Sequence, residues 1–274
     1  MRKYLLILWV GLLAGCSSNE DKKTLPAQQL SNVSYGPDAQ QVYDIDLPEA
    51  RNPATTKAIV LVHGGAWYGG SKSDMAAAAA FARLQFPQHA IVNLEYRLAT
   101  MGSPAYPKQI DDIRAALAHI ESQGYDIAAQ YAFLGVSAGA HLSMLYAYRF
   151  DLQHKVKVVG SMVGPTDFTD PAYTGSELAL SMLPFLVGND PSDELILQVS
   201  PTAHVSSDDP PTIQFLGNAD PLIPASQGER LEAALDAAGV TNERHIYNAA
   251  HGNFSFSDSQ DIFARLGGFF AAHL

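Results

Sequence analysis

Short apolar segments and longer amphipathic segments alternate along most of this chain. Residues 58–62 form a continuous apolar run and residues 90–94 a nearly continuous one, which is typical of strands buried on both faces of a sheet. Residues 107–123 instead carry isoleucine or leucine at steps of three and four, the spacing of a helix with one apolar face. Alternation of such strands and helices predicts βαβ units and a mostly parallel sheet.

The full pattern predicts a single α/β domain over residues 31–274, with helices on both faces of a central sheet. We expect strands at residues 42–47, 58–62, 90–94, 131–134, 156–163, 211–216 and 243–247. We expect helices at residues 73–86 (with Ser73 as the N-cap), 107–123, 140–149, 226–238 and 257–272.

Residues 166–199 depart from this alternation. The stretch is irregular, and residues 180–186 are rich in leucine and also contain methionine, proline and phenylalanine. Because long excursions inside compact domains tend to carry function, we predict a small lid-like insertion over a pocket. The alternative is that these residues are simply part of the packed surface.

Composition and charge narrow the class of protein. Hydrophobic residues make up 47% of the chain and charged residues 16%, so the chain can build a real core. The formal net charge is −11, which argues against nucleic acid as a partner because phosphate binding needs a basic surface. The chain also has no polybasic patch for an anionic membrane.

The first residues predict export and a lipid anchor. Arg2 and Lys3 precede an apolar run over residues 4–13, which is about half of the ~20 residues that a spanning helix needs. Residues 13–16 read Leu-Ala-Gly-Cys and resemble the lipobox of bacterial lipoproteins. An ordinary signal peptide with an incidental cysteine is the alternative.

The resemblance to lipoproteins implies that residues 1–15 are a signal peptide and that Cys16 is lipid-modified at the new N-terminus. We expect residues 16–30 to be the lipidated N-terminus and a flexible tether. Ser17, rather than an aspartate, follows the cysteine. In Gram-negative lipoproteins this points to the outer membrane, so the expected location is the bacterial cell envelope.

Residues 135–139, Gly-Val-Ser-Ala-Gly, lie between a predicted strand and a predicted helix. A serine flanked by glycines at such a junction is typical of a nucleophile elbow, a turn so sharp that glycine is needed where the backbones cross. The N-terminus of the helix adds oriented N–H groups for developing negative charge. Ser137 is therefore the candidate nucleophile. The alternative is a glycine-rich turn without a chemical role.

A serine hydroxyl needs a base and a group that orients the base. In a fold of this kind both follow the serine along the chain, on loops at the carboxyl ends of strands. Of the downstream histidines, only His251 occupies the loop between the last strand and the last helix. Asp220 follows the strand at 211–216 and is the candidate acid. Asp167 is its rival, although an aspartate there could equally hold a loop by accepting backbone N–H bonds.

Residues 63–70, His-Gly-Gly-Ala-Trp-Tyr-Gly-Gly, follow the apolar strand at 58–62. Stabilising an oxyanion takes N–H donors from the residue after the nucleophile and from this loop, which predicts the amides of Ala138, Gly65 and Ala66. We expect His63 to brace the turn as a buried histidine. Trp67 and Tyr68 are candidate pocket residues, although Trp67 could equally pack beneath the pocket.

In order along the chain, these motifs resemble those of α/β-hydrolases, in the esterase and lipase group related to hormone-sensitive lipase. Within that group the chain is similar to the BD-FAE and kynurenine-formamidase-like branch. Residues 63–67 resemble the HGGxW motif of that branch, and residues 95–99 resemble its (D/N)YRLAP segment, with Thr100 in place of the proline. Residues 135–139 match GxSxG.

The resemblance covers residues 34–272, and Asp220 and His251 fall where that family keeps its acid and base. It implies a serine hydrolase that cleaves small or short-chain acyl esters and uses no metal or organic cofactor. Hydrolysis of aryl formamides or amides by the same triad is the alternative, and a non-catalytic binding module on a hydrolase fold is the alternative of another class. Departures after Tyr96 and in residues 166–199 leave the substrate open, and the oligomeric state is open too.

Overall fold

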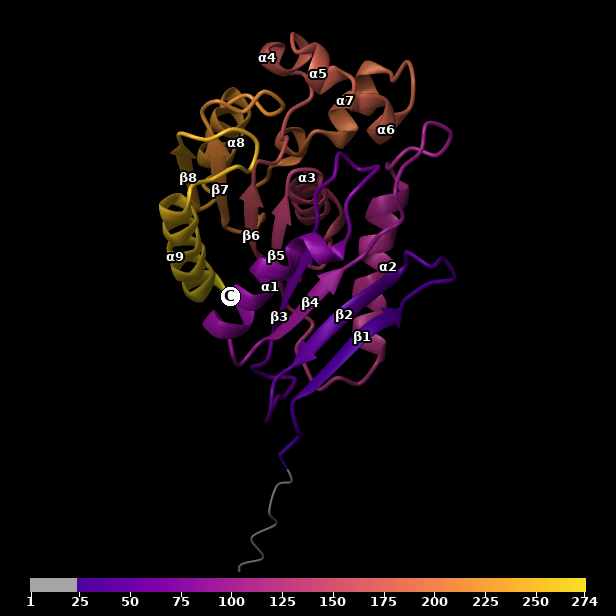
Figure 1. The fold of residues 1–274 in the computed structure, drawn as a ribbon, viewed down its shortest axis with the longest axis vertical. Helices are drawn as coiled ribbons and strands as arrows, with labels where there is room; N and C mark the ends of the chain where they lie inside the picture. The colour runs from indigo at the N-terminus through magenta and orange to yellow at the C-terminus, as the bar shows by residue number, and fades with distance from the viewer. Residues whose placement is uncertain (1–23) are drawn as a thin grey trace, which may run out of the picture.

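An eight-stranded sheet forms the centre of the computed structural model, which describes residues 24–274 (Figure 1). The strands are β1 (Gln28–Ser34), β2 (Val42–Leu47), β3 (Ala58–Val62), β4 (Ala90–Leu94), β5 (Tyr131–Val136), β6 (Val156–Met162), β7 (Thr212–Gly217) and β8 (Asn242–Tyr247). Their order across the sheet is β1-β2-β4-β3-β5-β6-β7-β8. β2 pairs antiparallel with β1 and β4, and all other neighbours are parallel. The predicted α/β class is confirmed.

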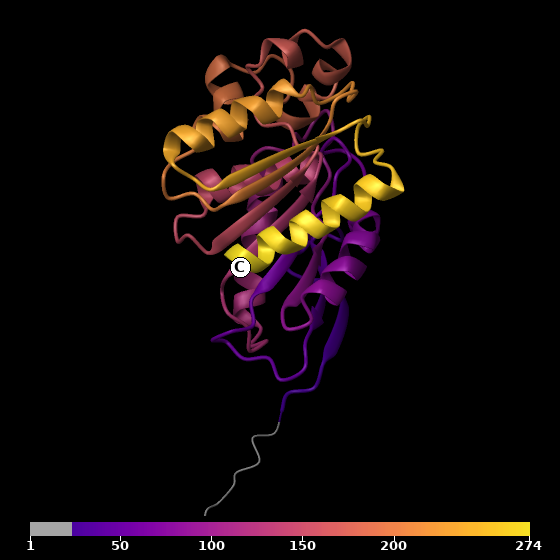
Figure 2. The same ribbon diagram turned by 90° about the vertical axis from the view of Figure 1, so that its left-hand side faces the viewer.

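Helices cover both faces of the sheet (Figures 1 and 2). Outside the insertion they are α1 (Ala76–Gln85), α2 (Lys108–Ser122), α3 (Ala138–Leu145), α8 (Ser226–Ala238) and α9 (Phe256–His273). Successive residues of β3 point to opposite faces, so Ile59 and Leu61 pack with α1 and α9, whereas Val60 and Val62 pack with α2, α3 and α8. The core is therefore two apolar layers, one on each side of the sheet.

The insertion at residues 166–199 folds into short helices. These are α4 (Pro171–Thr174), α5 (Glu177–Leu180), α6 (Leu183–Val187) and α7 (Asp193–Val199). They lie beyond the carboxyl ends of the parallel strands, at the top of Figure 1. Backbone amides of Ala105 and Tyr106 donate to the carbonyl oxygens of Phe185 and Leu186, which fastens the insertion to the segment before α2. The insertion is a packed helical cap, and its movement as a lid stays a prediction.

The amino-terminal predictions are tested only in part. The signal peptide at residues 1–15 and the lipidation site Cys16 lie outside the described residues. The tether predicted over residues 16–30 is wrong at its end, because residues 28–30 already belong to β1. This strand is polar and almost fully exposed, so it forms through backbone pairing with β2 and not through burial. A pattern of apolar positions therefore gives no sign of it.

Two helix boundaries also differ from the prediction. A 3₁₀ turn (Lys72–Met75) precedes α1, and it begins after Ser71 instead of the predicted N-cap Ser73. The N–H of Ser71 donates to Asp74 Oδ2 at 2.8 Å. Helix α3 ends at Leu145 and continues as a π-helical turn (Tyr146–Phe150). Within residues 24–274, no helix has both the length and the apolar character to cross a bilayer.

Candidate active site

The turn between β5 and α3 places Ser137 at the carboxyl edge of the sheet. Its backbone has φ 52° and ψ −119°, a conformation that side chains disfavour. The flanking glycines are required by space, because a Cβ on Gly135 would lie 2.4 Å from the carbonyl oxygen of Gly139 and one on Gly139 would lie 2.2 Å from that of Val62. The sequence motif therefore has the predicted strand-turn-helix geometry of a nucleophile elbow.

Ser137, His251 and Asp220 form a continuous hydrogen-bonded chain. His251 Nε2 lies 2.8 Å from Ser137 Oγ, and His251 Nδ1 lies 2.7 Å from Asp220 Oδ2. A carboxylate oxygen accepts and does not donate, so the proton of the neutral imidazole is on Nδ1. Nε2 is then free to accept from the serine hydroxyl. The three residues come from the loops after β5, β7 and β8, which end at the same edge of the sheet.

The Asp220 side chain is held by its own loop. Only 1% of it is exposed. Its Oδ1 accepts from the backbone N–H groups of Leu222 and Ile223 at 2.8 and 3.0 Å. These bonds leave Oδ2 directed at His251. The position of the carboxylate is thus fixed before any substrate arrives.

Asp167, the alternative candidate for the acid, lies in the loop after β6 and contacts Thr169 and Arg230. Its Oδ1 accepts from the N–H and the hydroxyl of Thr169 at 2.9 and 2.6 Å, and its Oδ2 pairs with Arg230. It therefore holds the loop after β6, the non-catalytic reading that the sequence left open. The structure brings Asp220, and not Asp167, to His251.

The loop after β3 faces the nucleophile elbow. Gly65, Ala66 and Trp67 have φ values of 117°, 48° and 67°, three successive residues in the left-handed region. A Cβ on Gly65 would lie 2.1 Å from the carbonyl oxygen of Gly69, so only glycine fits there. Within residues 24–274, the amides of Gly65, Ala66 and Ala138 donate to no acceptor of the protein. Three N–H groups thus remain available at this edge of the site.

His63 braces the start of this loop. The side chain is fully buried, its ring stacks on Tyr96 with centroids 4.1 Å apart, and Nε2 lies 3.0 Å from Glu95 Oε1. Its Nδ1 lies 2.7 Å from the carbonyl oxygen of Gly64. The hydroxyl of Tyr96 donates to the carbonyl oxygen of His63 at 2.7 Å. These contacts fit the structural role predicted for His63.

Two neighbouring spaces, which share several lining residues, adjoin Ser137. An open cleft of about 560 Å³ is bordered by Tyr68, which is 41% exposed and packs against Phe185 in a tilted arrangement, with ring centroids 4.1 Å apart. A much smaller chamber of about 30 Å³ is bordered by Trp67. The chamber walls also come from the elbow, the loop after β7 and the insertion, and they are Ala66, Trp67, Ser137, Ala138, Pro165, Tyr173, Ala179, Met182, Leu222, Ile223 and His251.

Sequence reasoning missed the chamber residues that lie outside the motifs. Tyr173, Ala179 and Met182 come from the insertion, and Leu222 and Ile223 follow Asp220. The only signal for the first three was their place within residues 166–199, since no spacing shows which side chains of an irregular stretch turn inward. The two pocket candidates divide between the spaces, Trp67 at the chamber and Tyr68 at the cleft.

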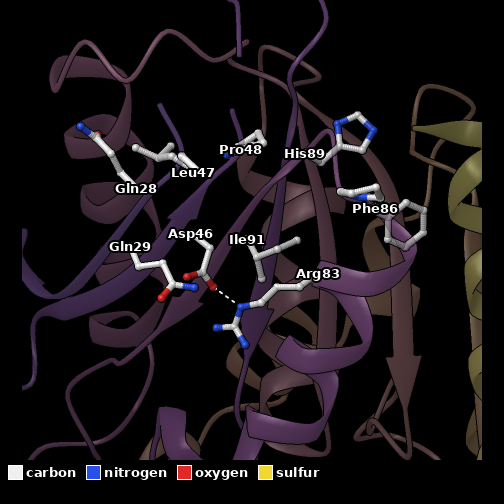
Figure 3. Close-up of a pocket in the computed structure, with 11 residues that line it drawn as sticks. Gln28, Gln29, Asp46, Leu47, Pro48, Arg83, Phe86, His89 and Ile91 are labelled. Atoms are coloured by element: carbon white, nitrogen blue, oxygen red, sulfur yellow. Dashed lines mark hydrogen bonds and ion pairs between the residues drawn. The ribbon is translucent and has the colours of Figure 1, made fainter. Parts of the chain in front are cut away.

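Another hollow, of about 300 Å³, lies far from Ser137 between β1, β2 and α1 (Figure 3). Among the residues that border it, Arg83 and Asp46 form an ion pair with each other, and His89 Nδ1 accepts from the N–H of Lys57. Its charged groups are therefore already partnered, and it offers no nucleophile. Elsewhere in the described part of the chain, no cluster of His, Cys, Asp and Glu is arranged to hold a metal ion.

Comparisons with known proteins agree on the fold. The BD-FAE family model matches residues 43–235. Esterase LipC of Mycobacterium tuberculosis is 27% identical over 243 residues, which cover 80% of this chain and 59% of LipC, so this chain spans less than two thirds of that relative. A truncated carbohydrate esterase from gut microbiota has a TM-score of 0.72 at 24% identity, covering 88% of this chain and 96% of that one. Esterase B from Lactobacillus rhamnosis has a TM-score of 0.71 at 21% identity, covering 89% and 87%. The architecture is the α/β-hydrolase fold.

Proposed function

This chain belongs to the BD-FAE family and has the α/β-hydrolase fold, and on that basis we propose that it hydrolyses carboxylic esters with Ser137 as the nucleophile. The observation that carries the proposal is the chain of hydrogen bonds from Ser137 Oγ through His251 to Asp220. The esterase names of the curated relatives and of the similar structures support the same class of substrate.

In the proposed reaction, Ser137 Oγ attacks the ester carbonyl while His251 Nε2 takes the hydroxyl proton. Asp220 keeps the other imidazole proton on Nδ1 and stabilises the imidazolium that forms. His251 then delivers the proton to the departing alcohol, which leaves an acyl-serine. A water molecule, activated by His251 in the same way, releases the acid and restores the serine.

The negative charge that develops on the carbonyl oxygen needs donors that are already in place. The amides of Gly65, Ala66 and Ala138 fit this role because they have no acceptor within the described chain and belong to residues that border the spaces beside Ser137. An oxyanion donor of this kind is worth about 3 kcal/mol in the barrier. A side-chain substitution does not remove a backbone N–H group. The contribution of these donors therefore depends on the contacts that hold the loop after β3 in position.

The two spaces suggest how an ester divides between them. At about 30 Å³ the chamber holds little more than an acetyl or propionyl group, since one water molecule needs roughly 10–15 Å³ by the same measure. The cleft is far larger and open, so an alcohol of considerable size can enter it and leave after acylation. We therefore assign the acyl group to the chamber and the alcohol to the cleft, which makes short acyl esters the proposed substrates.

We also propose that the domain is attached to a bacterial envelope membrane, the outer membrane by the pattern at Ser17, through a lipid on Cys16. The support for this proposal is the sequence of residues 1–17 alone. It is independent of the proposed chemistry, and each can fail without the other.

The activity is tested with p-nitrophenyl acetate, butyrate and octanoate, with an aryl formamide in parallel. We expect the acetate ester to be hydrolysed best and Ser137→Ala to lower kcat by at least about 1,000-fold, because the nucleophile is lost. A fluorophosphonate probe should label the wild type and not Ser137→Ala, while the surface variant Ser257→Ala should behave as the wild type. A folded wild type that neither reacts with the probe nor hydrolyses an ester would refute the proposal and favour a binding module. Faster turnover of the formamide would replace esters as the substrate.

A further inference from the structure

His141 is a buried histidine that the proposed reaction does not use. It lies one helical turn after Ser137 in α3, and its backbone N–H donates to the carbonyl oxygen of Ser137 at 3.0 Å. None of its surface is exposed. Its ring forms T-shaped pairs with the rings of Trp67 and Phe168, with centroids 5.5 and 5.3 Å apart. His141 therefore stands directly behind the nucleophile elbow.

Both ring nitrogens of His141 are engaged, and their partners fix the tautomer. The indole N–H of Trp67, which can only donate, points at Nδ1 at 3.1 Å. The carbonyl oxygen of Val199, which can only accept, lies 2.7 Å from Nε2. The proton must therefore be on Nε2. Burial lowers the pKa of His141 to about 4, so the ring stays in this neutral form at neutral pH.

Trp67 connects this histidine to the loop that carries the Gly65 and Ala66 amides. It is the residue after Ala66 and has a left-handed backbone of its own, with φ 67°. Its carbonyl oxygen accepts from the N–H of Ala99 at 2.9 Å and from the side-chain amide of Gln109 at 2.7 Å. The indole bond to His141 is its one side-chain hydrogen bond within residues 24–274. Among the described residues, it is the side-chain hydrogen bond that ties this loop to the helix of the nucleophile.

Val199 connects the same histidine to the insertion. It is the last residue of α7, where the final carbonyl groups of a helix have no partner within the helix. Its carbonyl oxygen accepts a hydrogen bond from the Nε2–H of His141 in a fully buried position. His141 is thus the meeting point of the loop after β3, the nucleophile helix and the end of the insertion.

We infer that His141 is a positioning residue, which holds the oxyanion amides of Gly65 and Ala66 in register with Ser137 through its bond to Trp67 and ties this pair to the insertion through Val199. The inference rests on the proposed esterase function. The alternative is a buried histidine that only stabilises the fold. The two differ because, in our inference, loss of the bond to Trp67 also raises the energy of the transition state. A histidine that serves only stability would change unfolding and leave kcat unaltered.

Two amide variants of His141 test its bond to Trp67 and its bond to Val199 one at a time. In His141→Asn the side-chain oxygen occupies the position of Nδ1, so the acceptor for Trp67 is kept and the donor to Val199 is lost. In His141→Gln the amide nitrogen reaches the position of Nε2, so the donor to Val199 is kept and the acceptor for Trp67 is lost. Trp67→Phe breaks the same bond from its other end. Tyr148→Phe is the matched control, since it removes a buried hydrogen bond of 2.7 Å to Thr212 away from the site.

The measurements are kcat and KM on p-nitrophenyl acetate, with thermal unfolding of each variant of the full chain. We expect His141→Gln and Trp67→Phe each to lower kcat about 10- to 100-fold with KM changed less than about threefold, because displaced oxyanion donors act mainly in the transition state. The double variant should lose no more than either single one, since both break one bond. His141→Asn and Tyr148→Phe should keep kcat within about fivefold of the wild type, at a comparable loss of stability.

Several outcomes decide the matter. If His141→Gln and Trp67→Phe keep wild-type kcat while their unfolding temperatures fall as in Tyr148→Phe, His141 is structural and the inference is overturned. Losses that multiply in the double variant would also overturn it. Should His141→Gln fail to fold, Trp67→Phe decides alone, and unaltered kcat there counts against the inference. A wild type with no esterase activity would instead refute the proposed function, and this result differs from one in which only the role of His141 is refuted.

Discussion

Ser137 combines the hydroxyl of the proposed nucleophile with a backbone conformation that its own Cβ disfavours. The φ of 52° and ψ of −119° are imposed from both sides, because its N–H donates to the carbonyl oxygen of Met162 at 2.7 Å and its carbonyl oxygen accepts from His141. Such a conformation costs on the order of 1–3 kcal/mol in a residue with a side chain. The strained turn directs the hydroxyl towards His251, and the stability of the surrounding sheet offsets the cost of the strain.

This strain predicts an ordering of two inactive variants. Ser137→Ala and Ser137→Gly both remove the hydroxyl, but only glycine removes the Cβ that opposes the turn. We expect Ser137→Gly to be more stable than Ser137→Ala by about 1 kcal/mol, after allowance for the greater freedom of glycine in the unfolded chain. Urea unfolding of both proteins measures the difference. An alanine variant that is the more stable of the two would show that the turn is not strained.

Side chains that the topology places could be predicted from sequence, and side chains placed by irregular packing could not. The predicted placement of His251 and Asp220 beside Ser137 agrees with the structure because each follows a strand whose carboxyl end reaches the same edge as Ser137. Trp67 stayed undecided, because its place depends on a hydrogen bond to His141, which lies 74 residues further along the chain. Contacts of that kind carry no local signature.

The elements follow the same division. The buried strands β3 and β4 were predicted to the residue, since an apolar run bounded by polar residues marks them clearly. The exposed edge strand β1 was missed, and the insertion showed no helical periodicity because α4 to α7 are each seven residues or fewer. Helices of one or two turns are set by caps and packing more than by a repeating apolar face.

The insertion supplies part of the chamber wall, so we expect it to set the length of the acyl chain. Met182→Ala would remove a side chain that borders both the chamber and the cleft. We predict that kcat/KM shifts from p-nitrophenyl acetate towards butyrate and hexanoate by about tenfold, a usual size for one or two methylenes in a pocket. Leu197→Ala is the control, because this residue of the same insertion is 49% exposed. An unchanged chain-length profile in Met182→Ala would mean that the acyl group lies elsewhere.

In the molecule as a whole, the first described residues and the insertion lie at opposite ends of the long axis. In Figure 1 the described chain begins at the bottom, whereas the insertion and the carboxyl ends of the parallel strands lie at the top. Residues 17–24 can span at most about 28 Å. A domain of about 250 residues is roughly 45 Å across, from a radius of gyration of about 18 Å. With its long axis upright on a membrane, a domain held by a lipid on Cys16 would therefore carry its insertion on the side away from the bilayer.

This geometry predicts which esters gain from anchoring. Full-length lipidated protein on phospholipid vesicles should hydrolyse soluble p-nitrophenyl acetate within about twofold of the unlipidated Cys16→Ser protein, because the cleft stays open to water. Esters carried by short-chain lipids within the same vesicles should be hydrolysed no faster by the anchored form. A large acceleration of lipid ester hydrolysis on anchoring would contradict the arrangement, and equal partition of both proteins into the vesicles would contradict the anchor itself.

The insertion lies at the opposite end from the first described residues, which also matters for whether the protein would hydrolyse the lipids of its own membrane. Hydrolases that act near lipids face the problem of sparing the membrane on which they reside. With the domain upright on its proposed anchor, distance would separate the insertion from the acyl chains of the host bilayer.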